Sequence, residues 1–160
     1  RTFIEHTQQI RSLGVKLKHS VNKTLIKNKS LILVDDSLVR GTTSVKIIKM
    51  LYEFGAKEVH LRISSPPIKY PDYYGVDTPN KEELLASKLD IESMRKFINA
   101  TTLQFLSIEG LYKSMGYKKR NPTYPQFTDH CFTGDYPIEP IDAHNKDFNK
   151  NQISFMASKS

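Results

Sequence analysis

The chain has 160 residues, which is the size of one ordinary domain. Hydrophobic residues make up 38% of it and charged residues 26%, a mixture that can build a core and that excludes wholesale disorder. The net charge is +7, but it is unevenly placed: residues 1–30 hold seven of the 24 Lys and Arg and one of the 17 Asp and Glu. We therefore expect a nearly neutral domain with a basic N-terminal segment.

Cys131 is the one cysteine in the sequence. A single cysteine excludes a disulfide framework within the chain, and it excludes a cysteine-based zinc site with the usual number of ligands. The sequence has no apolar run long enough for a transmembrane helix and no apolar signal region at its start. We expect a cytoplasmic protein without a membrane partner. Because the first residue is Arg1 rather than Met, we also expect a processed chain or a fragment.

A strand–helix–strand unit is predicted after the polar, basic residues 1–30. The apolar run 31–34 is short and rich in branched side chains, which is typical of a buried strand in a parallel sheet. A helical pattern follows from Val45 to Tyr52, and residues 59–63 alternate as a second strand. This order predicts a right-handed βαβ unit.

Further helices and one more strand are predicted downstream. The loop at 69–79 is rich in Pro, Tyr and Gly, and helices are expected to begin near Asn80, with Glu83 as its capping-box partner, and near Asp90. Residues 103–106 read as a third strand, followed by a helix that Ser107 caps. From residue 117 to 160 the pattern fades, and we expect an irregular tail. The fold class is α/β, a parallel sheet with flanking helices.

The residues that carry chemistry follow the first predicted strand. In an open α/β sheet, ligands bind at the carboxyl ends of the strands, where Asp35 and Asp36 lie. Two carboxylates at that edge can accept hydrogen bonds from vicinal hydroxyls of a ribose and can attract a divalent cation. The turn at 37–43 is rich in hydroxyls, Gly41 allows close backbone approach, and a helix N-terminus follows that favours an anion.

An acid pair after a strand, or a Thr-Thr-Ser cluster at a helix start, is on its own a common structural feature. Their ordered combination is much rarer and predicts a ribose 5-phosphate site. The segment is neither a Walker P-loop nor a Rossmann fingerprint, because both glycine patterns are absent.

Residues 31–43 resemble the phosphoribosylpyrophosphate (PRPP) signature of the type I phosphoribosyltransferases. The wider match resembles the C-terminal part of the glutamine PRPP amidotransferase family. It comprises six segments that occur in order: Arg-Thr-Phe-Ile at 1–4, Val-Asp-Asp-Ser-Leu-Val-Arg-Gly-Thr-Thr-Ser at 34–44, Gly-Ala-Lys-Glu-Val-His at 55–60, Ser-Ser-Pro-Pro at 64–67, Tyr-Gly-Val-Asp at 74–77 and Cys-Phe-Thr-Gly at 131–134. The signature alone indicates the superfamily, whereas the flanking segments indicate the amidotransferases.

The resemblance implies a glycosyltransferase that makes 5-phosphoribosylamine and pyrophosphate from PRPP and glutamine-derived ammonia, the committed step of de novo purine synthesis. It implies Mg²⁺ held by Asp35 and Asp36, and a basic loop at 1–20 that closes over PRPP. The residues expected to bind PRPP are Asp35, Asp36, Ser37, Arg40, Gly41, Thr42, Thr43, Ser44, Lys16 and Lys18. For Lys16 and Lys18 the alternative is that both are ordinary solvated lysines.

The same resemblance implies what this chain lacks. The glutaminase domain and its cysteine nucleophile are expected outside the chain, together with the first strands of the transferase domain. We therefore expect residues 1–116 to be the C-terminal part of a phosphoribosyltransferase domain, 117–160 to be an irregular extension, and the isolated fragment to be inactive with glutamine. Homo-oligomers and inhibition by purine nucleotides are also implied.

Some members of the family hold an iron–sulfur cluster, whose ligands would fall at Asp72, Thr128 and Cys131. One thiolate cannot hold a Cys₄ cluster, so we expect no cluster, and we expect Cys131 to be a small packing residue. The five histidines are scattered along the sequence, and we expect them to be surface or structural residues.

Two other functions remain open at this point. A PRPP-sensing regulator with the same fold could bind DNA through the basic segment, although the segment is short and has no helix-turn-helix pattern. An inactive gene remnant is the other alternative, against which the intact signature speaks.

Overall fold

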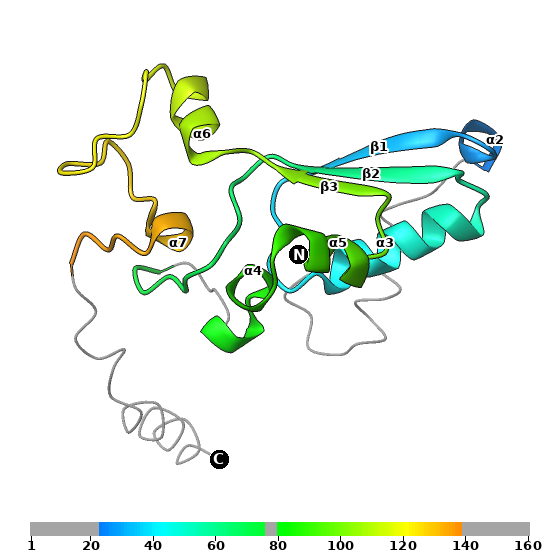
Figure 1. Ribbon diagram of the computed structural model, residues 1–160, viewed down its shortest axis with the longest axis horizontal. Coiled ribbons are helices and arrows are strands. Elements are labelled where there is room, and N and C mark those ends of the chain that lie inside the picture. The colour runs from blue at the N-terminus through cyan, green and yellow to red at the C-terminus, as the bar shows by residue number, and fades with distance from the viewer. Residues whose placement is uncertain (1–22, 76–79, 139–160) are drawn as a thin grey trace, which may run out of the picture.

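The structure is a computed structural model, and it describes residues 23–75 and 80–138. The elements are arranged as in Figure 1, and their bounds are α2 (Lys23–Ile26), β1 (Ser30–Asp35), α3 (Thr42–Glu53), β2 (Glu58–Ile63), the 3₁₀ turn η1 (Lys81–Glu83), α4 (Leu85–Lys88), α5 (Ile91–Phe97), β3 (Thr102–Phe105), α6 (Ile108–Ser114) and α7 (His130–Thr133). The predicted flexible loop at 1–20 lies outside the described residues.

The described strands form one parallel sheet in the order β1-β2-β3. Leu33 pairs with Leu61, and Leu61 with Leu103, so apolar side chains of the three strands share one face. The predicted βαβ unit and the third strand are confirmed. Parallel pairing brings the carboxyl ends of all three strands to one edge of the sheet.

Helices cover one face of this sheet, as Figure 1 shows for α3 and α5. Helix α3 turns Ile47, Ile48 and Leu51 inward, at the three- and four-residue spacing of an amphipathic helix. These side chains pack with buried residues of β2 and β3 into a core that α4 and α5 complete. The core therefore lies entirely on the α3 side of the sheet.

The opposite face of β1 is exposed. Ile32 and Val34 are 71% and 66% exposed, while Leu31 and Leu33, which point to the other face, pack against the core. The prediction of a strand is confirmed, but the prediction that the whole run is buried is wrong for these two side chains. A run of four apolar residues carries no alternation that distinguishes its two faces.

Beyond the carboxyl edge, the chain continues into α6 and a stretch with little regular structure. Ser107 caps α6 as predicted, because its hydroxyl accepts a hydrogen bond from the amide of Gly110 at 3.0 Å. The Asn80 cap is wrong: its side chain makes no capping bond to η1. Asp90, by contrast, caps α5 by accepting from the amide of Ser93 at 2.7 Å.

Asp129 is the centre of a buried polar cluster in this stretch. Its side chain is 4% exposed and accepts hydrogen bonds from Arg120 at 2.6 and 3.0 Å and from Tyr112 at 2.8 Å. Burial alone would raise the pKa of Asp129, but the hydrogen bonds from Arg120, Tyr112 and Thr133 outweigh burial and hold the pKa below its usual value. The ionised carboxylate therefore ties α6 to α7.

We expect Asp129→Asn to lower the free energy of unfolding by about 2–3 kcal/mol, near the lower end for a broken buried ion pair, because Arg120 keeps its contact with Asp135. Since the folded pKa lies below the unfolded one, the contribution is present at neutral pH and is lost as pH falls below about 4. Urea unfolding at pH 7 and pH 3 measures both. An equal loss at the two pH values would contradict this account, and Asp135→Asn is the matched control.

Short backbone hydrogen bonds join α7 to the loop that follows β2. The amides of Lys69 and Tyr70 both donate to the carbonyl of Cys131, at 2.9 and 3.1 Å. Burial and the nearby Asp72 carboxylate raise the pKa of the Cys131 thiol to about 11.

Within 23–75 and 80–138, no helix combines the length and apolarity needed to cross a bilayer.

Candidate functional site

The candidate site lies at the carboxyl end of β1. Asp35 is the last residue of the strand and Asp36 is the next along the chain, so the strand end places both carboxyl groups at the edge where ligands bind in open α/β sheets. The Asp35 carboxylate accepts a hydrogen bond from the amide of Asp36 at 3.0 Å, and Asp36 accepts one from the Ser37 hydroxyl at 3.0 Å. The acid pair is thus held by its own turn.

The neighbouring strand supports this turn through Ser64. Its amide and its hydroxyl both donate to the carbonyl of Asp35, at 2.9 and 3.1 Å. This role of Ser64 was not predicted, although two polar residues, Ser64 and Ser65, at the carboxyl end of the adjacent strand were the signal for it. The hydroxyl of Ser65 is buried and is without a hydrogen-bond partner in the described structure.

The loop between β1 and α3 is fixed to the core at two points. Leu38 is 1% exposed and belongs to the hydrophobic core. The carbonyl of Val39 accepts a hydrogen bond from the amide of Leu85 at 2.8 Å, which ties the loop to the start of α4. These two contacts restrain the backbone of the loop, and a restrained backbone favours binding of a phosphate by a turn.

Gly41 ends the loop, and a side chain at this position would be unfavourable for two physical reasons. Its φ is +77°, in the left-handed region where L side chains are strained. A Cβ at this position would lie 2.9 Å from Cδ2 of Leu85 and 3.1 Å from Cε1 of Phe97. The close approach of the loop to α4 and α5 therefore depends on this glycine.

The first turn of α3 contains Thr42, Thr43 and Ser44. The first amides of an α-helix have no acceptor within the helix, and they carry the positive end of its dipole. No acidic side chain occupies this turn. The structure shows the predicted helix start at this position, and the first turn of the 12-residue helix α3 has amide donors and hydroxyls of the kind that bind anions. Ser44 is buried at 3% exposure, whereas Thr42 is exposed.

Arg40 contacts a residue that is distant in the sequence, and this contact was not predicted. Its Nε lies 2.6 Å from Oε2 of Glu83 in η1, and both side chains are about half exposed. An exposed ion pair of this kind contributes at most about 1 kcal/mol. The assignment of Arg40 to PRPP binding stays a prediction, as do the assignments of Lys16 and Lys18, which lie outside the described residues.

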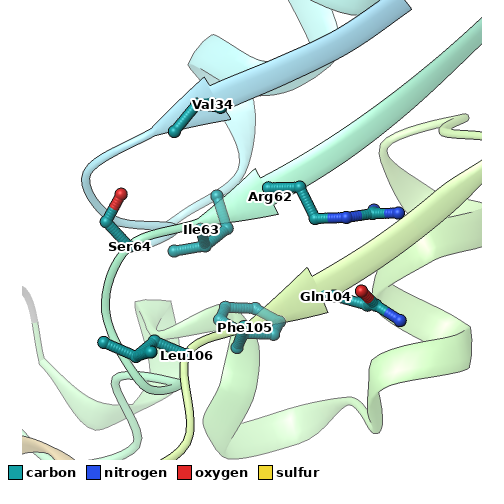
Figure 2. Close-up of a pocket in the computed structure, with 7 residues that line it drawn as sticks. All are labelled: Val34, Arg62, Ile63, Ser64, Gln104, Phe105 and Leu106. Carbon is teal, nitrogen blue, oxygen red and sulfur yellow. The ribbon is translucent and has the colours of Figure 1, made fainter. Parts of the chain in front are cut away.

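A hollow of about 400 Å³ lies at the carboxyl ends of the strands, on the sheet face that the described helices leave uncovered. Figure 2 shows that it spans the carboxyl ends of all three strands, from Val34 through Arg62 and Ser64 to Gln104. Arg62 reaches across to β3, where it donates to the hydroxyl of Thr102 at 2.9 Å. The hollow is therefore lined by both polar and apolar groups, and neither Asp35 nor Asp36 is among its lining residues.

The donor set at this edge suits a hard divalent cation. Asp35 and Asp36 supply carboxylate oxygens, and Ser37 supplies a hydroxyl, which are the ligand types that Mg²⁺ prefers. Mg²⁺ is commonly held by one or two carboxylates together with substrate oxygens, so this pair is sufficient without a dedicated protein cage.

Curated proteins similar in sequence to this chain are amidophosphoribosyltransferases. No protein-family model matches the chain. The amidophosphoribosyltransferase of Rhizobium etli is 56% identical over 159 residues, which cover 99% of this chain and 32% of that protein. The amidophosphoribosyltransferase of Bacillus subtilis is 50% identical over 139 residues, covering 87% and 29%.

A solved structure similar to this chain is of the same kind of enzyme as these curated relatives. The glutamine PRPP amidotransferase of B. subtilis, in complex with ADP and GMP, aligns with a TM-score of 0.69 and 50% identity, over 86% of this chain and 30% of that one. The chain thus spans about a third or less of the length of the relatives it matches.

Proposed function

Because the chain belongs to the amidophosphoribosyltransferase family over the length that it spans, we propose that it supplies the PRPP-binding part of such an enzyme. The reaction is transfer of the phosphoribosyl group from PRPP to ammonia, which gives 5-phosphoribosylamine and pyrophosphate. The observation that carries the proposal is the geometry at one sheet edge: an acid pair, a fixed loop and a helix N-terminus follow one another within ten residues.

In this proposal each part of the edge binds one part of the substrate. Asp35 and Asp36 accept hydrogen bonds from the two ribose hydroxyls. The loop amides and the first turn of α3, with Ser37, Thr42, Thr43 and Ser44, bind the 5-phosphate. Ammonia then attacks C1 of the ribose as the bond from C1 to pyrophosphate breaks.

Catalysis by this arrangement rests on positioning and charge rather than on a protein nucleophile. Positive charge builds on the sugar as pyrophosphate leaves, and the two carboxylates lie on the ribose side, where they stabilise it. Mg²⁺ bound at Asp35 and Asp36 would neutralise charge on the departing pyrophosphate. We further propose that the basic segment with Lys16 and Lys18 excludes water from this site.

The remaining functions require parts of the enzyme beyond this sheet edge. We propose that ammonia comes from a glutaminase domain, and that residues 1–116 complete a phosphoribosyltransferase domain to which residues 117–160 form an extension. Purine nucleotides are proposed as inhibitors and a homo-oligomer as the assembly. The ADP and GMP complex of the B. subtilis relative supports the nucleotide proposal.

The direct test is formation of 5-phosphoribosylamine by the complete protein from PRPP, Mg²⁺ and free ammonia, followed as pyrophosphate release. We expect ammonia-dependent release in the absence of glutamine. Release that does not depend on ammonia would show hydrolysis of PRPP only and would contradict the proposal. Binding of duplex DNA by a protein that does not convert PRPP would instead favour the PRPP-sensing regulator.

Arg40 offers a separate test, because its structural and its functional roles predict different results. Arg40→Ala removes an exposed ion pair, so the free energy of unfolding should change by less than about 1 kcal/mol. If Arg40 binds PRPP, loss of a charge-assisted hydrogen bond should raise KM for PRPP by about tenfold or more. Glu83→Gln breaks the same ion pair and is the matched control. An equal rise in KM for both variants would show that Arg40 only positions the loop.

A further inference from the structure

Three side chains of different chemistry meet where α7 packs against the loop after β2. Asp72 comes from that loop, and His130 and Cys131 are the first two residues of α7, nearly sixty residues further along the chain. Their ligand atoms all lie within 4.8 Å of one another. The side chains of Asp72 and His130 are 7% and 5% exposed, so the cluster is buried rather than a group of surface charges.

The distances within the cluster are close to those of a tetrahedral metal site. Nε2 of His130 lies 2.9 Å from Oδ2 of Asp72, and Sγ of Cys131 lies 3.8 Å from the same oxygen. Zinc bonds of about 2.0–2.3 Å place a nitrogen and an oxygen ligand about 3.4 Å apart, and an oxygen and a sulfur ligand about 3.6 Å apart. For these two ligand pairs, movements of roughly half an ångström would therefore reach the distances of a zinc site.

The protein already holds the three groups in place. Oδ1 of Asp72 accepts the amide of Tyr74 at 2.6 Å, which leaves Oδ2 directed toward the histidine and the cysteine. The rings of Tyr74 and Tyr136 each lie 5.0 Å from the His130 ring. Outer partners of this kind fix the orientation of metal ligands.

The imidazole is not fully satisfied by the protein. Nδ1 of His130 is buried and is without a hydrogen-bond partner among the described residues. Buried polar atoms are nearly always hydrogen-bonded, so this nitrogen is an exception. A metal ion in the cluster would bind the other ring nitrogen, Nε2, which faces Asp72.

We propose that Asp72, His130 and Cys131 bind one zinc-like transition-metal ion. Nitrogen, oxygen and sulfur ligands together favour Zn²⁺ over Mg²⁺ or Ca²⁺, which prefer oxygen alone. Three protein ligands leave the fourth position to water, which reaches the site because Cys131 is only partly buried. On binding, the thiol proton of Cys131 passes to solvent and a sulfur–metal bond forms.

The bound metal would stabilise the packing of α7 against the loop after β2 and would take no part in the phosphoribosyl transfer. Its ligands come from two segments that are already joined by the backbone bonds from Lys69 and Tyr70 to Cys131. Metal bound to the native state alone stabilises it by mass action. The competing explanation is a metal-free hydrogen bond between Asp72 and His130 that joins the same segments.

Cobalt(II) is the probe that separates these explanations, because a bound thiolate gives a sulfur-to-cobalt charge-transfer absorption. The complete protein is freed of metal with a chelator and titrated with Co²⁺ under a non-thiol reductant, and then with Zn²⁺. We expect one Co²⁺ per chain at this absorption, displacement by Zn²⁺, and a melting temperature several degrees higher with Zn²⁺. Cys131→Ser should abolish the absorption and the thermal shift, and Asp72→Asn should weaken binding by tenfold or more.

His60→Asn is the matched control, because His60 and Glu58 form a second histidine–carboxylate pair at 3.5 Å that has no cysteine beside it. This variant should keep the absorption. X-ray absorption of the zinc-loaded wild-type protein should show one sulfur neighbour, and this measurement does not depend on the variants folding. Absence of the charge-transfer band in the wild-type protein, or a zinc shell of nitrogen and oxygen alone, would overturn the proposal in favour of the metal-free pair.

Discussion

Replacing Asp35 and Asp36 together by asparagine lowers ammonia-dependent formation of phosphoribosylamine by at least about 100-fold, if the two carboxylates hold the ribose and Mg²⁺ as proposed. Loss of a mere outer partner of a metal ligand costs 10–100-fold in affinity or activity, and this variant removes both proposed ligands. Asparagine keeps the shape of each side chain, so its amide oxygen can still accept the bonds from the Asp36 amide and from Ser37. Steady-state rates at saturating Mg²⁺ measure the effect.

Glu53→Gln is the control for the loss of negative charge, because Glu53 is exposed at the end of α3 that is remote from the acid pair. We expect its rate to equal that of the wild-type protein. Circular dichroism of the double variant verifies that the fold is retained. A folded double variant with a normal rate would remove the ribose and metal assignments.

The second large effect is expected from Gly41→Ala. The added methyl group is strained at φ +77° and meets Leu85 and Phe97 at 2.9 and 3.1 Å. Left-handed strain costs about 1–2 kcal/mol, and an overpacked contact typically adds about 1–3 kcal/mol. We expect a loss of about 3 kcal/mol in the free energy of unfolding. We also expect a large rise in KM for PRPP, because the loop between β1 and α3 must move away from α4 and α5. Urea unfolding and initial rates measure the two effects.

Gly116→Ala separates the two causes. Gly116 has a similar φ of +87°, but a Cβ there meets nothing within 4 Å. This control should lose only the strain, about 1–2 kcal/mol, and should keep its KM for PRPP. If Gly41→Ala lost no more stability than Gly116→Ala and bound PRPP normally, the close packing of the loop would not matter to the site.

Local patterns were sufficient to predict the strands and the acid pair. The short apolar run at 31–34, the alternation at 59–63 and the position of Gly41 before a helical pattern all depend on neighbours in the sequence, and the structure shows β1, β2 and α3 where these features predict them. Ser107 as a helix cap was predicted for the same reason, since a cap bonds within three residues. Asn80 looked similar in sequence, but a 3₁₀ turn rather than an α-helix follows it.

Contacts between distant residues could not be predicted in this way. Arg40 and Glu83 are 43 residues apart, and no periodicity joins them. Asp72 and His130 are 58 residues apart, and they meet only because α7 folds back onto the loop after β2. The exposure of Ile32 and Val34 was not predicted, because it depends on which elements cover the sheet, and a run of four apolar residues carries no information about that.

Equilibrium binding of PRPP to the complete protein tests the central claim most directly. Calorimetric titration in the presence of Mg²⁺ should show saturable binding of one PRPP per chain, which ribose 5-phosphate competes away and which a metal chelator weakens. The Asp35→Asn, Asp36→Asn double variant should bind at least about tenfold more weakly, and Glu53→Gln should bind normally. Undetectable binding to the wild-type protein, or equal affinity in the double variant, would contradict the assignment of this sheet edge as the PRPP site.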